Sequence, residues 1–281
     1  MVQASQVVAI TGATAGLGRA TVSALALKGA SLVLLARNVD KAKAVSRQAR
    51  TAGAGPVEVI ECDLSVMSSV RQAVAELNER GIAVDVLVND AVVATPTRTT
   101  TSEGHEMMLA TNYLGPCLLT RLILAGLPQG QPFRLITVGG ALKAKPDLED
   151  LESAKDFSVG STFERSKTAL NLFTAAAPRR FETVDLRAVI FTPGLMKTGL
   201  SATLAAAMNP VARAATRVLP SPVKQAQGLA GLVLSPSIGD ALPGTLIDSS
   251  GKTSMMPLHD DIELQDALWE LTSQYLGIDM T

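Results

Sequence analysis

The sequence predicts an α/β fold built on a single doubly wound parallel sheet, with helices on both faces. Three observations support this prediction. Short apolar runs alternate with amphipathic helical patterns, a glycine-rich turn follows the first apolar run, and 47% of the residues are hydrophobic against 18% charged. Strands covered by helices on both faces are apolar throughout, and a repeated strand-then-helix order is typical of a parallel sheet.

The expected elements follow in chain order. The first part should contain strands at 7–10, 31–36, 57–61 and 84–88, and helices at 19–28, 39–51 and 65–78, the last capped by Ser65. The second part should contain a helix at about 102–127, strands at 134–138, 186–191 and 245–248, and helices at 163–180 and 224–234. We expect residues 1–281 to form one domain, with a substrate-loop region at about 195–222 in which Asn209 and Pro210 begin a short helix.

The charge and cysteine content exclude several classes of function. The net charge is −1, from 25 basic and 26 acidic residues, and no Lys or Arg cluster could neutralise a run of phosphates, so no nucleic acid partner is expected. Cys62 and Cys117 lack the spacing of metal ligands, so no metal site is expected. The sequence has neither a signal-peptide pattern nor about 18 uninterrupted apolar residues, which predicts a cytoplasmic protein with no transmembrane segment.

The first strand leads into a glycine turn that opens a helix. Glycine permits positive φ angles and close backbone approach, and a helix N-terminus presents free N–H groups to an anion. In this context the spacing predicts a Rossmann-type site for a dinucleotide pyrophosphate. The alternative is a tight turn that only joins strand to helix. The site would be formed by Thr11, Gly12, Thr14, Ala15, Gly16, Leu17 and Gly18.

The end of the second strand distinguishes between NAD and NADP. NAD sites place an acid there to hold the ribose hydroxyls, whereas an arginine can accept the 2′-phosphate of NADP. This strand ends in Arg37 and Asn38 without a carboxylate, so we expect NADP(H), with the Arg37 guanidinium on the phosphate. The alternative is a solvated arginine at a strand end.

Together these motifs resemble the short-chain dehydrogenase/reductase family over nearly the whole chain. The family pattern Thr-Gly-x-x-x-Gly-x-Gly is met at the glycine turn, and the family's Asn-Asn-Ala-Gly stands here as Asn89-Asp90-Ala91-Val92, without the glycine. The resemblance implies an adenine contact at Asp63 and a catalytic role for Asn112. The further cofactor contacts that it implies are Leu64, Asn89, Ala91, Lys167, Pro193, Gly194 and Thr198.

Two segments suggest a branch of this family. Residues 111–120 and 267–277 are most similar to the retinol dehydrogenase, protochlorophyllide reductase and WW-domain oxidoreductase branch. This similarity implies a bulky lipophilic small-molecule substrate, over which the apolar residues 200–219 could close. A homo-oligomer is compatible with the resemblance.

The catalytic segment departs from the family pattern. In the family a Tyr four residues before a Lys donates a proton to the carbonyl oxygen, and a Ser after the fifth strand orients that oxygen. Here Phe163 precedes Lys167 and Gly140 occupies the Ser position, so only Asn112 and Lys167 carry over as catalytic residues. General acid catalysis is worth about 10² to 10⁴ in rate, so its loss would cripple ketone reduction without weakening cofactor binding.

Few other side chains could replace the missing acid. They are Ser158, Ser161, Thr162, Glu164 and Tyr113, which lie near Phe163 or Asn112 in sequence, and the two histidines His105 and His259. The sequence does not say where they point, and none is assigned a role.

Three functions remain open. The first is an NADPH-dependent reductase of an iminium or an activated C=C bond, a substrate that does not need the tyrosine proton. The second is a non-redox cyclase or isomerase, or a binding protein that senses NADP(H). The third is an ordinary carbonyl reductase in which Phe163 is an introduced, inactivating change, and Gly140 argues against it because one change would have sufficed.

Overall fold

An eight-stranded sheet runs through the molecule in the order β3-β2-β1-β4-β5-β6-β7-β8. The computed structural model describes residues 6–194, 196, 200, 204, 219, 221–235 and 241–278. Most of the predicted substrate loop, the expected helix at Asn209 and the cofactor residue Thr198 therefore lie outside the described residues. The division of the chain into one domain stays a prediction, as does its cytoplasmic location.

The strands confirm the doubly wound sheet. Their bounds are β1 Val7–Thr11, β2 Ser31–Ala36, β3 Val57–Glu61, β4 Val86–Asn89, β5 Pro132–Val138, β6 Asp185–Thr192, β7 Thr245–Asp248 and β8 Thr253–Met255. Neighbours from β3 through to β7 pair in parallel, and β8 pairs antiparallel with β7. The strand predicted at 245–248 is confirmed as β7, but it is not the last strand, because the chain turns at Gly251 (φ 84°) and returns as β8, which was not predicted.

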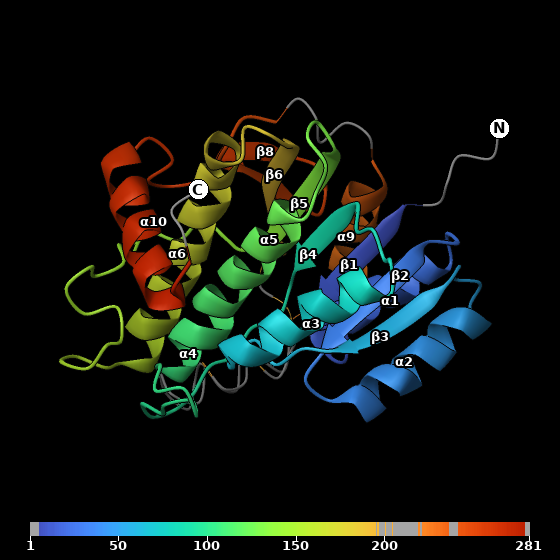
Figure 1. Cartoon of the computed structure of the whole chain (residues 1–281), viewed down its shortest axis with the longest axis horizontal. Coiled ribbons are helices and arrows are strands. Elements are labelled where there is room, and N and C mark those ends of the chain that lie inside the picture. Colours follow the sequence, from blue (N-terminus) through green and yellow to red (C-terminus); the bar gives the residue numbers. More distant parts are fainter. Residues whose placement is uncertain are drawn as a thin grey trace.

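Helices cover both faces of the sheet (Figure 1). One face carries α1 Gly16–Ala26, α2 Val39–Thr51 and α9 Val223–Leu234, whose apolar side chains form one core cluster with the strands. The other face carries α3 Met67–Glu79, the short α4 Met107–Leu109, the π-helical turn η1 Ala110–Leu114, α5 Gly115–Ala125 and α6 Val159–Arg180. A last helix, α10 Ile262–Leu276, packs on the outer side of α6.

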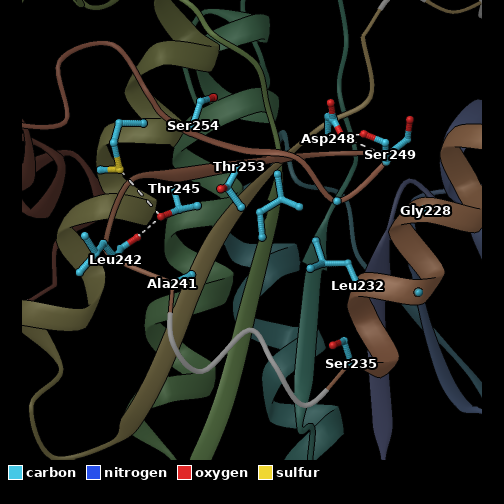
Figure 2. Close-up of a pocket in the computed structure, with 15 residues that line it drawn as sticks. Gly228, Leu232, Ser235, Ala241, Leu242, Thr245, Asp248, Ser249, Thr253 and Ser254 are labelled. Carbon is cyan, nitrogen blue, oxygen red and sulfur yellow. Dashed lines mark hydrogen bonds between the residues drawn. The ribbon is translucent and has the colours of Figure 1, made fainter.

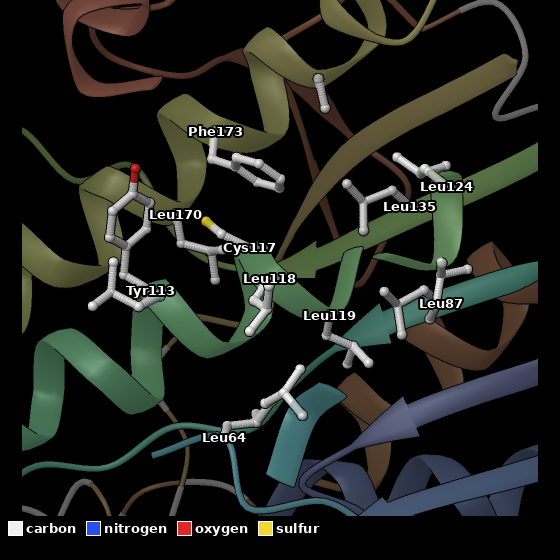
Figure 3. Packing of buried hydrophobic residues seen from close by; sticks show 14 of the residues in the cluster. Leu64, Leu87, Tyr113, Cys117, Leu118, Leu119, Leu124, Leu135, Leu170 and Phe173 are labelled. Atoms are coloured by element: carbon white, nitrogen blue, oxygen red, sulfur yellow. The ribbon is translucent and has the colours of Figure 1, made fainter. Parts of the chain in front are cut away.

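The α5–α6 face holds the larger core cluster. Figure 3 shows part of it, in which Cys117 and Leu118 of α5 lie beside Leu170 and Phe173 of α6. The segment Met107–Ala125 is long and apolar enough to cross a membrane, but 89% of it is buried inside the protein. Its apolar character on all sides is what a helix enclosed by protein requires.

The start predicted for the long helix and the cap predicted for α3 were wrong. The long helix begins at Met107 rather than near 102, because Thr100 bridges to Glu106 and the Glu106 side chain caps α4 by accepting the N–H of Leu109. Ser65 does not cap α3, because its hydroxyl donates to Asp63 instead (2.6 Å). The cap comes from the distant Glu103, whose carboxylate accepts the N–H groups of Met67 (2.5 Å) and Ser68 (3.1 Å).

The strand order reverses direction between β1 and β4. From β1 the chain continues outward to β2 and β3, whereas β5, β6 and β7 continue outward from β4 on the other side. Ligands of doubly wound sheets bind in the crevice beyond the carboxyl ends of the strands at such a reversal. The residues that follow β1, β4 and β5 are therefore the place to look for a site.

Candidate functional site

The glycine turn joins β1 to α1 at this reversal. Gly12 (φ 72°) and Gly16 (φ 52°) both adopt the left-handed conformation that favours glycine. The residue before α1, Ala15, offers no side-chain cap, and both Ala15 and Gly16 are exposed. Ala15 and Gly16 thus leave the start of α1 accessible to an outside acceptor, as an anion site requires.

Thr11 ties this turn to the end of β4. Its hydroxyl oxygen accepts the N–H groups of Asp90 (3.0 Å) and Ala91 (3.1 Å). A Cβ atom at Gly12 would lie 2.9 Å from the Ala91 backbone, so only glycine fits there. The turn and the residues after β4 consequently form one tightly packed unit.

Asp90 lies beneath the glycine turn with its carboxyl group buried. Its carboxylate accepts the N–H of Gly18, and a Cβ atom at Gly18 would lie 2.5 Å from its Oδ2. Burial raises the pKa of Asp90 to about 7, while the charge of Lys167 and the Gly18 N–H act to lower it. We assigned Asp90 no role from the sequence. The sequence does mark this position, because Asp90 stands where the family pattern has a neutral Asn.

The ends of β2 and β3 place the predicted adenosine-binding residues side by side. Arg37 is exposed, and no described residue pairs with its guanidinium. Asn38 instead caps α2 by accepting the N–H of Lys41 (2.9 Å). One oxygen of Asp63 is taken up by the N–H and hydroxyl of Ser65. The next residue, Leu64, is buried.

Lys167 and Asn112 are held by the protein itself. Lys167 Nζ donates to the carbonyl oxygen of Val138 at the end of β5 (2.7 Å). Burial lowers the pKa of Lys167 to about 8, and Asp90 opposes this shift. Asn112 sits in the π-helical turn, a feature often found at functional sites, and its side chain bonds to both backbone groups of Val93 and to the Ser166 hydroxyl.

Neither expected hydroxyl position carries a hydroxyl. Phe163 lies one helical turn before Lys167 on α6 and is partly buried. A Cβ atom at Gly140 would meet only Leu142, at 3.8 Å, whereas one at Gly139 would lie 2.2 Å from Oδ1 of Asn171. Space for a side chain after β5 therefore exists at Gly140 and not at Gly139.

A model of the short chain dehydrogenase family matches residues 6–209. The chain belongs to this family. Family members are oxidoreductases that use a nicotinamide cofactor, and the predicted likeness to the retinol dehydrogenases is confirmed by the curated relatives.

Three relatives illustrate the range of the family. Mouse retinol dehydrogenase 14 is 30% identical over 96% of this chain and 86% of its own length. A Streptomyces sp. (strain C5) protein named as a daunorubicin C-13 ketoreductase is 32% identical over 96% of this chain and 92% of its own. A crystal structure from Mycobacterium paratuberculosis, 28% identical, superposes with a TM-score of 0.70 over 98% of this chain and 95% of that one.

Three of the other candidate acids of this short-chain dehydrogenase are hydrogen-bonded to other protein groups. Ser158 and Ser161 bond to each other at the start of α6 (2.7 Å). Glu164 accepts the N–H groups of Lys143 and Ala144 and so fixes the loop after Gly140. The Thr162 hydroxyl is buried and has no hydrogen-bond partner in the described part of the chain.

The aromatic and histidine candidates are also hydrogen-bonded to other protein groups. Tyr113 is fully buried and its hydroxyl pairs with Thr272 of α10 (2.5 Å). His105 bonds to Glu152, and His259 bonds to the carbonyl oxygen of Met256. None of these groups provides the missing proton donor.

The remaining predicted cofactor residues sit at strand ends. Asn89 ends β4, and its Nδ2 donates to Thr120 while its Oδ1 is buried without a partner in the described structure. Pro193 and Gly194 (φ 69°) follow β6. No group of three His, Cys, Asp or Glu side chains among the described residues could hold a metal ion.

A second hollow lies away from these residues. It is a groove of about 750 Å³ between α9 and the β7–β8 hairpin. Figure 2 shows its lining, with Leu232 on α9 facing the hairpin and Thr245 hydrogen-bonded to Leu242. Its lining includes neither the glycine turn nor Lys167, so we do not assign it to the candidate site.

Proposed function

We propose that this chain is an NADP(H)-dependent reductase of a bulky lipophilic small molecule. It acts on an iminium or an activated C=C bond rather than on a simple ketone. One observation carries the proposal: an open dinucleotide-binding turn lies beside a reaction site whose two hydroxyl positions are Phe163 and Gly140. The active site is thus atypical for the family.

The cofactor side fits a dinucleotide. The uncapped N-terminus of α1 is suited to the pyrophosphate, and Lys167 is suited to the nicotinamide ribose. Arg37 favours NADP(H), because its guanidinium is exposed at the strand end and no acid stands at this position to hold ribose hydroxyls. When bound, the nicotinamide supplies a hydride.

The reaction side favours a substrate that needs no strong acid. A carbonyl must gain a proton as hydride arrives, and neither Phe163 nor Gly140 can give one. An iminium already carries the positive charge, so holding it against the cofactor can suffice. Lys167 is assigned to the nicotinamide ribose rather than to the substrate, and one of its three N–H groups already donates to Val138.

The relatives support the substrate class. Their names include retinol, a long apolar alcohol, and daunorubicin, a large polycyclic molecule. The partly buried Phe163 adds an apolar ring beside Lys167 where the family has a polar one. A bulky lipophilic substrate is consistent with both.

Single-turnover mixing tests this function. The wild-type chain is mixed with NADPH and either a cyclic iminium, an enone or a ketone of matched size, and the absorbance of the reduced cofactor is followed. We expect decay with the iminium or the enone, and a rate with the ketone that is at least about 100-fold lower. No decay with any iminium or enone, or equal rates with the ketone, contradicts the proposal.

A non-redox role is the second candidate. The engagement of Ser158, Glu164, Tyr113 and His105 with other protein groups favours it, because it leaves no described acid for carbonyl reduction. Such a cyclase, isomerase or NADP(H)-sensing protein would turn over or bind without changing the cofactor. Stoichiometric oxidation of NADPH during turnover excludes it.

A further inference from the structure

Asp90 places a carboxyl group inside the cofactor turn. Its backbone N–H is fixed by Thr11, and its carboxylate accepts the N–H of Gly18 in the first turn of α1. The residue is only 9% exposed. A potential negative charge therefore lies under the turn that is suited to the pyrophosphate, where it also occupies one of the helix N–H groups.

The surroundings of Asp90 contain a single charged side chain among the described residues. This is Lys167 of α6, whose ammonium also donates to Val138 at the end of β5. The neighbouring turn contributes the N–H of Gly18 from α1, and β1 contributes the neutral hydroxyl of Thr11. One shared cation thus balances the carboxylate before any ligand arrives.

A dinucleotide adds negative charge to this balance. Like charges in one site disfavour the ionised carboxylate, and buried groups are screened little by salt. Since burial already holds the pKa of Asp90 at about 7, the phosphates would push it higher. The ionised fraction present near neutral pH then has to take a proton for the cofactor to bind well.

We propose that Asp90 takes up a proton when the dinucleotide binds, so that cofactor affinity falls as the pH rises. The inference rests on the proposed cofactor site. Its sign follows from linkage: a ligand that raises the pKa of a group binds its protonated form more tightly. The dissociation constant of NADPH should rise by up to about tenfold per pH unit above pH 7, until the pKa of the complex is reached.

Titration calorimetry in buffers of different ionisation enthalpy measures the proton directly. At pH 8 the 2′-phosphate of NADPH is already ionised, since such groups titrate near pH 6, so its own protonation contributes little. We expect the wild type to take up between about 0.5 and 1 proton per NADPH bound. Binding without proton uptake overturns the inference and leaves the cofactor site standing, whereas no binding of NADPH contradicts both.

Variants separate Asp90 from Lys167, which could also take up a proton. In Lys167→Met the uptake should persist and move to higher pH, because the cation that lowers the pKa of Asp90 is gone. In the double variant Asp90→Asn/Lys167→Met it should vanish, and NADPH should bind more tightly at pH 9 than in Lys167→Met. Loss of uptake in Lys167→Met assigns the proton to Lys167 and contradicts the proposal.

Two further measurements show whether the change in proton uptake comes from Asp90 itself rather than from misfolding of a variant. Asp85→Asn alters the carboxyl group before β4, at the opposite end of the strand, and should leave the uptake unchanged. Difference infrared spectra of the wild type should gain the C=O band of a protonated carboxyl group when NADPH is added. The absence of that band in a sample that binds NADPH contradicts the proposal without any mutation.

Discussion

The glycine turn and the β5–α6 edge both lie at the carboxyl edge of the sheet, but their polar groups are used differently. At the turn, the residue before α1 offers no side-chain cap, Ala15 and Gly16 are exposed, and Asp90 accepts the N–H of Gly18. At the β5–α6 edge, Lys167 bonds to Val138 and Asn112 bonds to Val93 and Ser166. The glycine turn is accessible to a ligand, whereas the polar side chains at the β5–α6 edge are hydrogen-bonded to other protein groups. We infer that cofactor binding and proton transfer depend on separate parts of this fold.

The largest effect is expected from Gly18→Ala, which places a methyl group inside the tightly packed glycine turn. The new methyl would lie 2.5 Å from the Gly12 carbonyl oxygen and from Asp90 Oδ2. Dinucleotide titration should show affinity at least about 100-fold lower, equivalent to about 2.7 kcal/mol. Urea unfolding should show a stability loss of about 1–3 kcal/mol from overpacking.

Gly160→Ala is the matched control for that change. Gly160 lies in the first turn of α6, where an added Cβ would meet nothing within 4 Å. Alanine there should change stability by no more than about 1 kcal/mol, in the stabilising direction, and leave binding unchanged. Equal effects of the two substitutions would contradict the packing of the turn against Asp90.

A smaller effect is expected from Arg37→Ala, which tests whether the open glycine-turn region selects NADPH over NADH. Removing a charge-assisted contact to the 2′-phosphate costs about 1.5–3 kcal/mol, so Arg37→Ala should weaken NADPH binding by roughly 10-fold to 100-fold. NADH binding should not change. Arg47→Ala, an exposed arginine on the adjacent helix α2, should alter neither. A parallel loss of NADH affinity in Arg37→Ala would contradict NADP(H) selectivity.

The smallest effect concerns the two glycines after β5. Gly139→Ala would force a methyl against Asn171 and Ile190 and should lower stability by about 1–3 kcal/mol. Gly140→Ala should stay within about 0.5 kcal/mol of the wild type. Thermal unfolding of both variants checks this order, and its reversal would move the open position to Gly139.

The sequence predicted the helices and strands that have strong patterns. The buried strand β2, the strand β3 and the helix α2 have the predicted bounds, because short apolar runs and helical periodicity are local signals. β8 was missed because its three residues are exposed and show no alternation. α10 was not identified from its pattern, although Asp261 at its start and Gly277 (φ 57°) at its end are ordinary cap residues.

The site was predictable where a motif is contiguous. The glycine turn and the Phe163–Lys167 spacing could be read directly, since their geometry is set by neighbours in the chain. The departure from the family's Asn marks Asp90 in the sequence, but the N–H groups that Asp90 and Glu103 bind could not be predicted, because only the fold brings them near. A long-range contact of this kind leaves no periodic trace in the sequence.

The double variant Phe163→Tyr/Gly140→Ser tests the separation of binding from proton transfer most directly. The space at Gly140 admits a serine, and the tyrosine would stand one turn before Lys167. NADPH dissociation constants of the wild type and the double variant should agree within about twofold, while single-turnover ketone reduction should rise by about 100-fold or more. An unchanged ketone rate with unchanged NADPH binding would contradict the account.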